Sequence, residues 1–310
     1  MKSSLAGRSL ISMRDLSIPE LKLVLDTAAA VKKTPTAYRD RFAHKTLGMI
    51  FQKPSLRTRV SFEAGMTQMG GHAIYLAPSD IKLGERETTE DIAIVLSRYC
   101  DLIMARVFGH NIVEDLARHA TVPVINGLSD HEHPCQTLAD LQTIQERHGR
   151  LAGLNFVYSG DGNNVAHSLM LGGALCGMNV TIVTPPGYEP KPQVLSDSQA
   201  IGRETKAQIR VTNDLAAAVK GADVIYTDVW ASMGQEADAE NRRRFFTPYQ
   251  VNSKALSLAN PHCIVLHCLP AHYGEEIEYE VTRTRNSAIF DQAENRLHAQ
   301  KALMLLLAGV

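Results

Sequence analysis

Short β-rich runs alternate with helical patterns along most of the chain, and this alternation constrains the fold more than any other feature. The runs lie at 46–52, 73–77, 101–107 and 122–126 in the first half, and at 155–159, 179–184, 223–228 and 264–269 in the second. The run at 180–183 lacks the period of two that a half-buried strand shows, as expected of a strand covered on both faces. The order of elements therefore predicts an α/β fold with parallel sheets and helical crossovers.

The length of the chain predicts two α/β domains, each with a mainly parallel sheet flanked by helices. A chain of 310 residues with 45% hydrophobic content can bury two cores of ordinary size. A helical pattern followed by the turn-like stretch 149–153 suits a connector, and we place the domains at residues 1–135 and 136–293. The segment 294–310 is too apolar to remain in water, so it is expected to pack back on the first domain. Open α/β sheets bind ligands at the carboxyl ends of their strands, which predicts an active-site cleft between the domains.

Charge and cysteine content exclude several classes of protein. The formal net charge is −1, so no overall positive field would recruit nucleic acid. Five cysteines are odd in number and do not have the spacing of a disulfide scaffold, which favours a reducing compartment. No apolar run approaches the length of a membrane span, and the N-terminal stretch lacks the hydrophobic core of a signal peptide. We expect a cytoplasmic protein without membrane or nucleic-acid partners.

The run 51–63 contains two arginines and two hydroxyl side chains within five residues, at a point where a helix is expected to begin. Pro54 disfavours helical geometry at Lys53, and Ser55 can cap the helix. The free N–H groups of the first turn, the helix dipole and Arg57 would then converge on one anion, which a planar guanidinium binds bidentately. This pattern predicts a phosphate site, although a basic pair at a helix start can also be a solvated surface.

The tetrapeptide His-Pro-Cys-Gln at 133–136 follows a predicted strand and opens the connector helix. His133 can donate a hydrogen bond to a developing oxyanion, and the Gln136 carbonyl can accept one from an NH₂ group. A plain loop role for His131 and His133 remains an alternative. The histidines of this half have no helical i,i+4 pair or cysteine pair beside them, so we expect no metal site.

Polar side chains also follow predicted strands in the second half. Asn163 and Asn164 stand in a glycine-containing loop that lacks the third glycine of the dinucleotide fingerprint, so NAD binding is not expected. They can bind a small ligand's carboxylate or ammonium, or cap a helix. Asp228 suits an ammonium ligand or a loop cap, and Cys268 ends another strand, where it is either functional or inert.

Four motifs in this order carry a resemblance to a known family. They are Ser-x-Arg-Thr-Arg at 55–59, His-Pro-Cys-Gln at 133–136, Asp-x-x-x-Ser-Met-Gly at 228–234 and His-Cys-Leu-Pro at 267–270. The chain resembles the aspartate/ornithine carbamoyltransferase family over essentially its whole length, and its Ser-Met-Gly motif and Cys268 are ornithine-type features. The resemblance implies transfer of the carbamoyl group of carbamoyl phosphate to the δ-amine of L-ornithine, through a tetrahedral intermediate, giving L-citrulline and phosphate.

The resemblance also implies the organisation of the enzyme. Residues 1–135 would bind carbamoyl phosphate and 136–293 would bind ornithine. No metal or organic cofactor is implied, and the catalytic unit would be a homotrimer, or a multiple of trimers, with active sites shared between subunits. The reaction would be a step of arginine biosynthesis or of a urea-cycle-type pathway.

Site residues follow from the same resemblance. The catalytic residues would be Arg57, His133, Cys268 and Asp228. Carbamoyl phosphate would be held by Ser55, Leu56, Arg57, Thr58, Lys82, Arg106, His133, Gln136, Cys268, Leu269 and Arg296. L-Ornithine would be held by Asn164, Asp228, Ser232 and Met233. Lys82 replaces a glutamine that usually reaches a neighbouring subunit's phosphate site, so that contact stays open. Leu56 replaces a commoner threonine.

Two alternatives remain at this stage. A carbamoyltransferase with another amine acceptor, N-acetylornithine or putrescine, would differ only in loop details. A non-catalytic amino-acid sensor would bind without turnover. The sequence leaves open an anabolic or catabolic role, allosteric regulation and assembly beyond the trimer.

Overall fold

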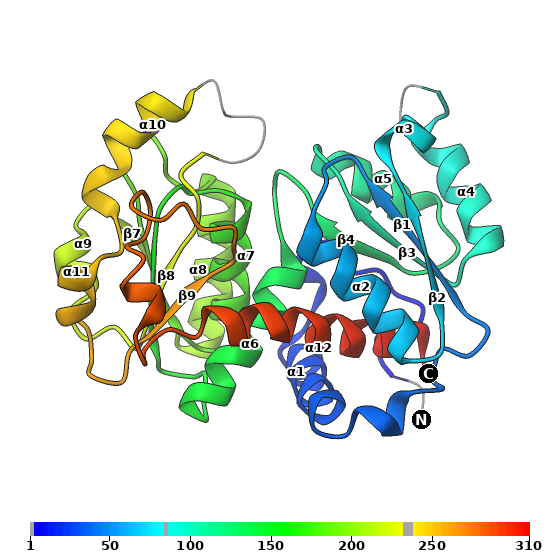
Figure 1. Cartoon of the computed structure of the whole chain (residues 1–310), viewed down its shortest axis with the longest axis horizontal. Helices are drawn as coiled ribbons and strands as arrows, with labels where there is room; N and C mark the ends of the chain where they lie inside the picture. Colours follow the sequence, from blue (N-terminus) through cyan, green and yellow to red (C-terminus); the bar gives the residue numbers. More distant parts are fainter. Residues whose placement is uncertain (1–2, 84–85, 232–237) are drawn as a thin grey trace. The chain divides into compact units, whose positions relative to one another are not determined.

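The computed structural model describes residues 3–83, 86–231 and 238–310, and the chain divides into two compact units. One unit runs to Gln142 and includes Glu294–Val310, and the other is Thr143–Ala293. The limits between the units fall inside two helices, α6 (Pro134–His148) and α12 (Ile289–Ala308). Figure 1 shows one sheet with flanking helices in each unit. The predicted fold class is confirmed.

The first unit has a four-stranded parallel sheet in the order β2-β1-β3-β4. Its strands are β1 (Thr46–Phe51), β2 (His72–Leu76), β3 (Leu102–Arg106) and β4 (Val124–Leu128). Its other helices are α1 (Ile18–Lys33), α2 (Leu56–Gln68), α3 (Pro78–Ile81), α4 (Thr89–Tyr99) and α5 (His110–His119). Ile50, Ile103 and Ala105 form one buried cluster with Ala93 of α4 and Leu116 of α5. These two helices therefore cover one face of the sheet.

The second unit has a five-stranded parallel sheet in the order β7-β6-β5-β8-β9. Its strands are β5 (Asn155–Ser159), β6 (Asn179–Val183), β7 (Ile209–Thr212), β8 (Val224–Thr227) and β9 (Ile264–His267). Its helices are α7 (Asn164–Leu175), α8 (Pro192–Thr205), α9 (Leu215–Ala218), α10 (Ala239–Phe246) and α11 (Ser253–Ser257).

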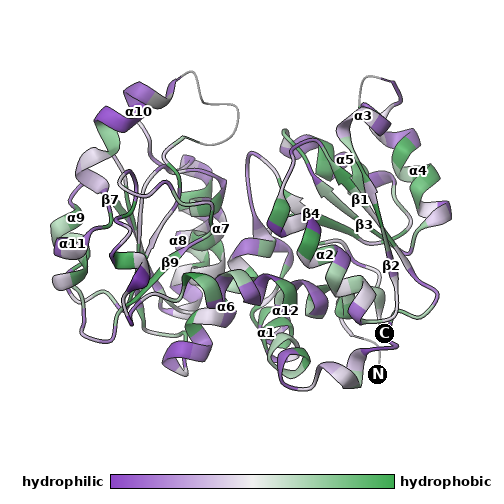
Figure 2. Cartoon of the chain, in the orientation of Figure 1, coloured by the Kyte–Doolittle hydropathy of each residue, from purple (hydrophilic) through white to green (hydrophobic). Residues whose placement is uncertain are grey.

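Burial explains why these segments form their elements. Much of the hydrophobic colour in Figure 2 lies on the strands and on α7, whose residues after Asn164 are all buried. A Cβ at Gly173 would lie 2.5 Å from Val180 Cγ2, so the glycine lets α7 approach β6 closely. No described helix is long and apolar enough to cross a membrane.

All eight predicted runs overlap a strand, but β7 was missed. It has four residues at the edge of the second sheet, and only Ile209 is buried while Arg210 is exposed. A short edge strand does not need the continuous apolar run that marks a central parallel strand.

Candidate active site

Several predicted binding residues follow the strands that flank the point where the strand order of each sheet reverses. In the first sheet this point lies between β1 and β3, and in the second between β5 and β8. Connections leave the sheet in opposite directions there, which opens a crevice at the carboxyl ends of the strands. The loop to Ser55 follows β1, and Arg106 ends β3; Asn163 follows β5, and Asp228 follows β8.

The helix α2 begins as its sequence predicts. Ser55 has extended backbone and its hydroxyl accepts a hydrogen bond from Thr58 N–H, which confirms it as the N-cap. Leu56 is 74% exposed in the single chain, so its side chain contributes no buried packing and its N–H remains the useful group. Of the two arginines, Arg59 pairs with Glu63 at 3.0 Å and lies over the Tyr75 ring. This leaves Arg57, half-buried on the first turn, as the candidate anion ligand.

Arg296 of α12 joins three segments of the first unit. Its Nη1 donates to Gln136 Oε1 at 2.9 Å, its Nη2 to Thr58 Oγ1 at 3.2 Å, and its Nε to Gln300 Oε1 at 2.9 Å. Gln300 in turn donates to Ser61 of α2 at 2.7 Å. The guanidinium is buried and fixed at the start of α2, as a preorganised anion ligand should be.

His133 lies in a buried and positively charged environment. Burial lowers its pKa well below the usual value, and the Arg296, Arg106 and Arg57 guanidiniums lower it further. The imidazole is therefore neutral at physiological pH. A neutral imidazole can donate one hydrogen bond to a carbonyl oxygen without carrying a charge of its own.

The Asp228 carboxylate accepts hydrogen bonds from several groups of the second unit. These hydrogen bonds come from the Cys268 thiol at 2.9 Å and from Asn163 Nδ2 at 3.1 Å, and also from Val229 N–H. Asn163 caps α7 through Val165 and Ala166 N–H, so the capping alternative is confirmed for it, together with this second contact. Asn164 is the first residue of α7.

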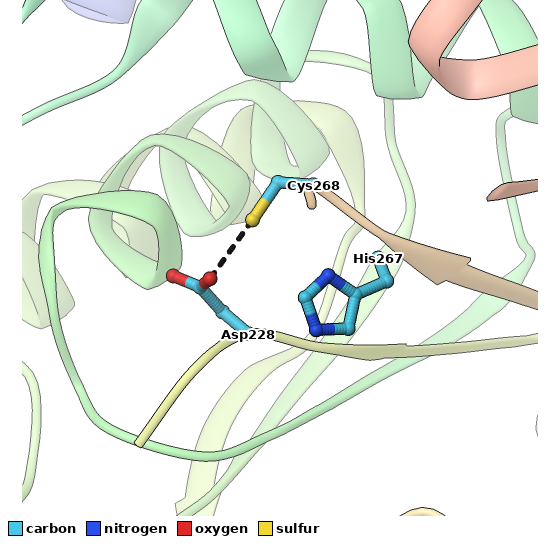
Figure 3. Close-up of side chains that lie close together, drawn as sticks. All are labelled: Asp228, His267 and Cys268. Atoms are coloured by element: carbon cyan, nitrogen blue, oxygen red, sulfur yellow. Dashed lines mark hydrogen bonds between the residues drawn. The ribbon is translucent and has the colours of Figure 1, made fainter. Parts of the chain in front are cut away.

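His267 supports the loop that carries Cys268. Leu269 N–H donates to His267 Nδ1 at 2.8 Å, and His267 Nε2 lies 3.0 Å from Glu276 Oε1 in a fully buried pair. Since Nδ1 accepts, the ring proton is on Nε2 and is donated to Glu276. Figure 3 shows Asp228, His267 and Cys268 close together, with the thiol directed at the carboxylate.

These three side chains offer ligand atoms within 4.8 Å of one another, as a metal site would. Both ring nitrogens of His267 already have protein partners, however. The arrangement therefore fits hydrogen-bonded positioning of the Cys268 loop better than metal ligation.

Comparison with known proteins identifies the family. Residues 8–146 match the family model "Aspartate/ornithine carbamoyltransferase, carbamoyl-P binding domain", and residues 152–307 match "Aspartate/ornithine carbamoyltransferase, Asp/Orn binding domain". The chain belongs to the aspartate/ornithine carbamoyltransferase family. The ornithine carbamoyltransferase of Thermococcus kodakarensis is 55% identical over 100% of this chain and 99% of its own. The anabolic ornithine carbamoyltransferase of Pyrococcus furiosus is 53% identical, with the same coverage. A solved ornithine carbamoyltransferase structure from Pyrococcus furiosus has a TM-score of 0.96, 52% identity, and coverage of 100% and 99%.

Several of the predicted site residues form two groups, and each group lies within one unit. In the first unit, hydrogen bonds link Arg296 to Thr58 and Gln136, and Arg57, Arg106 and Arg296 act on the pKa of His133. In the second, Asp228 and Cys268 are in direct contact.

Lys82 is not joined to these groups in the part of the chain that the structure describes. Lys82 is exposed at the C-terminal end of α3, in left-handed backbone, and its side chain has no hydrogen bond to them within the described ranges. Ser232 and Met233 lie outside the described residues.

Sequence reasoning missed the residues that hold the site residues in place. Asp140, which accepts from Gln136, and Gln300, which accepts from Arg296, stand outside the four motifs. Glu276 is nine residues from His267, and Asn163 was predicted as a helix cap or a ligand-binding residue, not as a partner of Asp228. The helical i,i+4 spacings of Gln136 with Asp140 and of Arg296 with Gln300 were the signals that could have indicated these pairs.

Proposed function

We propose that this chain catalyses carbamoyl transfer from carbamoyl phosphate to the δ-amine of L-ornithine, producing L-citrulline and phosphate. The observation that carries the proposal is the charge arrangement of the two half-sites. Arg57, Arg106 and Arg296 surround a neutral His133 in one unit, and the Asp228 carboxylate meets the Cys268 thiol in the other. A phosphate dianion and an ammonium ligand require these opposite environments.

Carbamoyl phosphate is assigned to the first domain, residues 1–135, with Arg296 from the C-terminal helix. Its phosphate is bound by the N–H groups of the first turn of α2 and by the side chains of Ser55, Arg57, Thr58, Arg106 and Arg296. His133 donates to the carbamoyl oxygen, on which negative charge develops as the tetrahedral intermediate forms. The neutral state of His133 supports this role, because a neutral donor leaves the arginines to neutralise the charge.

L-Ornithine is assigned to the second domain, residues 136–293, with Asn164, Asp228, Ser232 and Met233 as ligands. Its δ-amine must lose a proton before it attacks, which at pH 7 costs roughly 4–5 kcal/mol for an alkyl amine with a pKa near 10.4. Asp228 and Cys268 are the nearby groups that orient the amine and relay this proton. The backbone of Cys268 and Leu269 completes the carbamoyl end of the site. No covalent enzyme intermediate is needed.

A homotrimer is part of the proposal, and exposed apolar side chains of the first unit support it. Leu56 and Val60 of α2 and Val95 and Tyr99 of α4 are between 43% and 74% exposed in the single chain. Burial against a second copy would remove this surface from water. Lys82 would extend from one subunit to the phosphate site of the next.

The proposed setting is cytoplasmic arginine biosynthesis. None of the five cysteines, all of which lie in the described ranges, forms a disulfide. Burial raises the pKa of Cys135, Cys176 and Cys263 to about 12, so these thiols stay protonated. The name of one relative supports the biosynthetic direction, since the Pyrococcus furiosus protein is an anabolic ornithine carbamoyltransferase.

The test is citrulline formation from carbamoyl phosphate and L-ornithine, with N-acetylornithine, putrescine and L-aspartate as parallel acceptors. Turnover with ornithine alone supports the proposal, and preference for another acceptor contradicts the assignment of Asp228. Arg57→Ala should reduce kcat about 10²–10³-fold, as loss of one preorganised donor does. Arg59→Ala, two residues along the same helix, is the matched control and should keep activity, because Arg59 already binds Glu63 and Tyr75.

A further inference from the structure

The buried amide of Gln136 is held between a carboxylate and a guanidinium. Gln136 Nε2 donates to Asp140 Oδ1 at 2.8 Å, and Gln136 Oε1 accepts from Arg296 Nη1 at 2.9 Å. All three side chains are almost fully buried. Asp140 follows Gln136 by one turn of α6, so the helix itself sets the distance between them.

These two neighbours permit only one orientation of the amide. A carboxylate accepts hydrogen bonds, and a guanidinium only donates them. If the amide were turned over, its oxygen would face Asp140 and its NH₂ group would face Arg296. Two acceptors and two donors would then meet where water cannot separate them, which is strongly unfavourable in a buried network.

The orientation of the amide bears directly on Arg296. The guanidinium is held by Gln136 at Nη1, Thr58 at Nη2 and Gln300 at Nε. Loss of the Gln136 contact would leave one side of the guanidinium free to turn away from Thr58 and the start of α2. The hydrogen bond from Arg296 to Gln136 is charge-assisted and therefore strong, so its loss should weaken the positioning of the guanidinium.

We propose that Asp140 is a positioning residue for carbamoyl phosphate. By selecting one orientation of the Gln136 amide, it directs the Gln136 carbonyl oxygen to Arg296 and holds the Arg296 guanidinium at the phosphate-binding turn of α2. This inference rests on the proposed function, because it concerns the binding of the same substrate.

The primary test is Asp140→Asn, which conserves volume but supplies both a donor and an acceptor, so residue 140 no longer excludes the turned amide and only Arg296 opposes it. Titration calorimetry on the full-length protein should show Kd for inorganic phosphate and carbamoyl phosphate rising about tenfold, equivalent to about 1.4 kcal/mol. KM for ornithine should stay within about twofold of wild type. The control is Asp223→Asn. Asp223 is a buried carboxylate at the amino end of β8, where it accepts from Asn155 N–H and Asn260, so this variant should leave both Kd values unchanged.

A second background separates positioning from a general effect of charge or stability. In Gln136→Met the amide is gone, so adding Asp140→Asn should change the phosphate Kd by less than about twofold. An equal tenfold cost in both backgrounds would overturn the proposal, as would an unchanged Kd in Asp140→Asn alone. If wild type bound phosphate and carbamoyl phosphate but formed no citrulline, the proposed function would fail while the Asp140 inference could still be tested by binding.

Discussion

The ion pair between Arg242 and Asp161 is the best place to measure what a buried charge contributes to this protein. Arg242 Nη1 donates to Asp161 Oδ2 at 2.7 Å and to the Trp230 carbonyl at 2.8 Å, and both charged side chains are about nine-tenths buried. The contact joins α10 to the loop after β5 and to the residue two positions beyond Asp228. Its loss should therefore affect the ornithine side of the site as well as stability.

Arg242→Met should destabilise the second unit by about 3–5 kcal/mol at pH 7, the usual cost of leaving one member of a buried pair without its partner. Methionine keeps part of the packing on the rings of Tyr188 and Phe246, over which the guanidinium lies. The double variant Asp161→Asn/Arg242→Met removes the stranded charge. It should recover most of the loss, leaving about 1 kcal/mol for the missing hydrogen bond to Trp230.

The loss of stability in Arg242→Met should depend on pH, because Asp161 can take up a proton. Burial raises the pKa of Asp161, and Arg242 opposes part of that rise. Without Arg242 the pKa of the folded state rises further above the unfolded value of about 3.9, so the penalty is largest at high pH. As pH falls towards the raised pKa, the carboxylate takes up a proton and the penalty shrinks by at most about 1.4 kcal/mol per pH unit.

The assay is urea unfolding followed by the fluorescence of Trp230, the single tryptophan, which is buried beside the pair. Wild type, the single variant and the double variant are compared at pH 7 and pH 5. A loss below about 1 kcal/mol in Arg242→Met at pH 7 would refute the reasoning. So would a double variant no more stable than the single one, because the cost would then come from packing and not from charge.

Three further outcomes are expected. The pKa of His133 is lowered on folding, so below about pH 6.5 the unfolded chain binds more protons than the folded one. The free energy of unfolding should then fall by up to about 1.4 kcal/mol per pH unit. His133→Gln should flatten this slope in urea unfolding between pH 7.5 and 5.5. Cys268→Ser should shift the pH profile of kcat/KM for ornithine, because thiol and hydroxyl differ in acidity, and full turnover with an unchanged profile would contradict a proton relay. If the proposed trimer forms through α2, Val60→Glu should dissociate it in sedimentation experiments. Phe245→Glu, whose native side chain is 52% exposed against 51% for Val60, should not, and equal behaviour of the two variants would argue against α2 as an interface.

The sequence predicts those parts of the fold and site that depend on local pattern. Central strands such as β6 are recognisable because burial on both faces requires a continuous apolar run. The start of α2 is recognisable because Pro54 disfavours helical geometry before it and Ser55 caps the helix after it. Pairings between distant residues leave no such trace. The resemblance names Arg296, but its contacts with Gln136, 160 positions away, and with Thr58, 238 positions away, are visible only in the folded first unit.

The same limit applies to electrostatics. From the composition alone the chain is nearly neutral, with a net charge of −1, and nothing in that value predicts a strong field anywhere. The fold separates the charges locally, since three arginines act on one buried histidine in the first unit, while a carboxylate collects a thiol and an amide in the second. Arg296 and Asp228 are each hydrogen-bonded to side chains of their own unit, so both of these charges are positioned before any substrate arrives. A phosphate dianion would therefore bind in the first unit and an alkyl ammonium in the second because of their charges. The binding energy would then contribute to removing the amine's proton, since these side chains are already arranged.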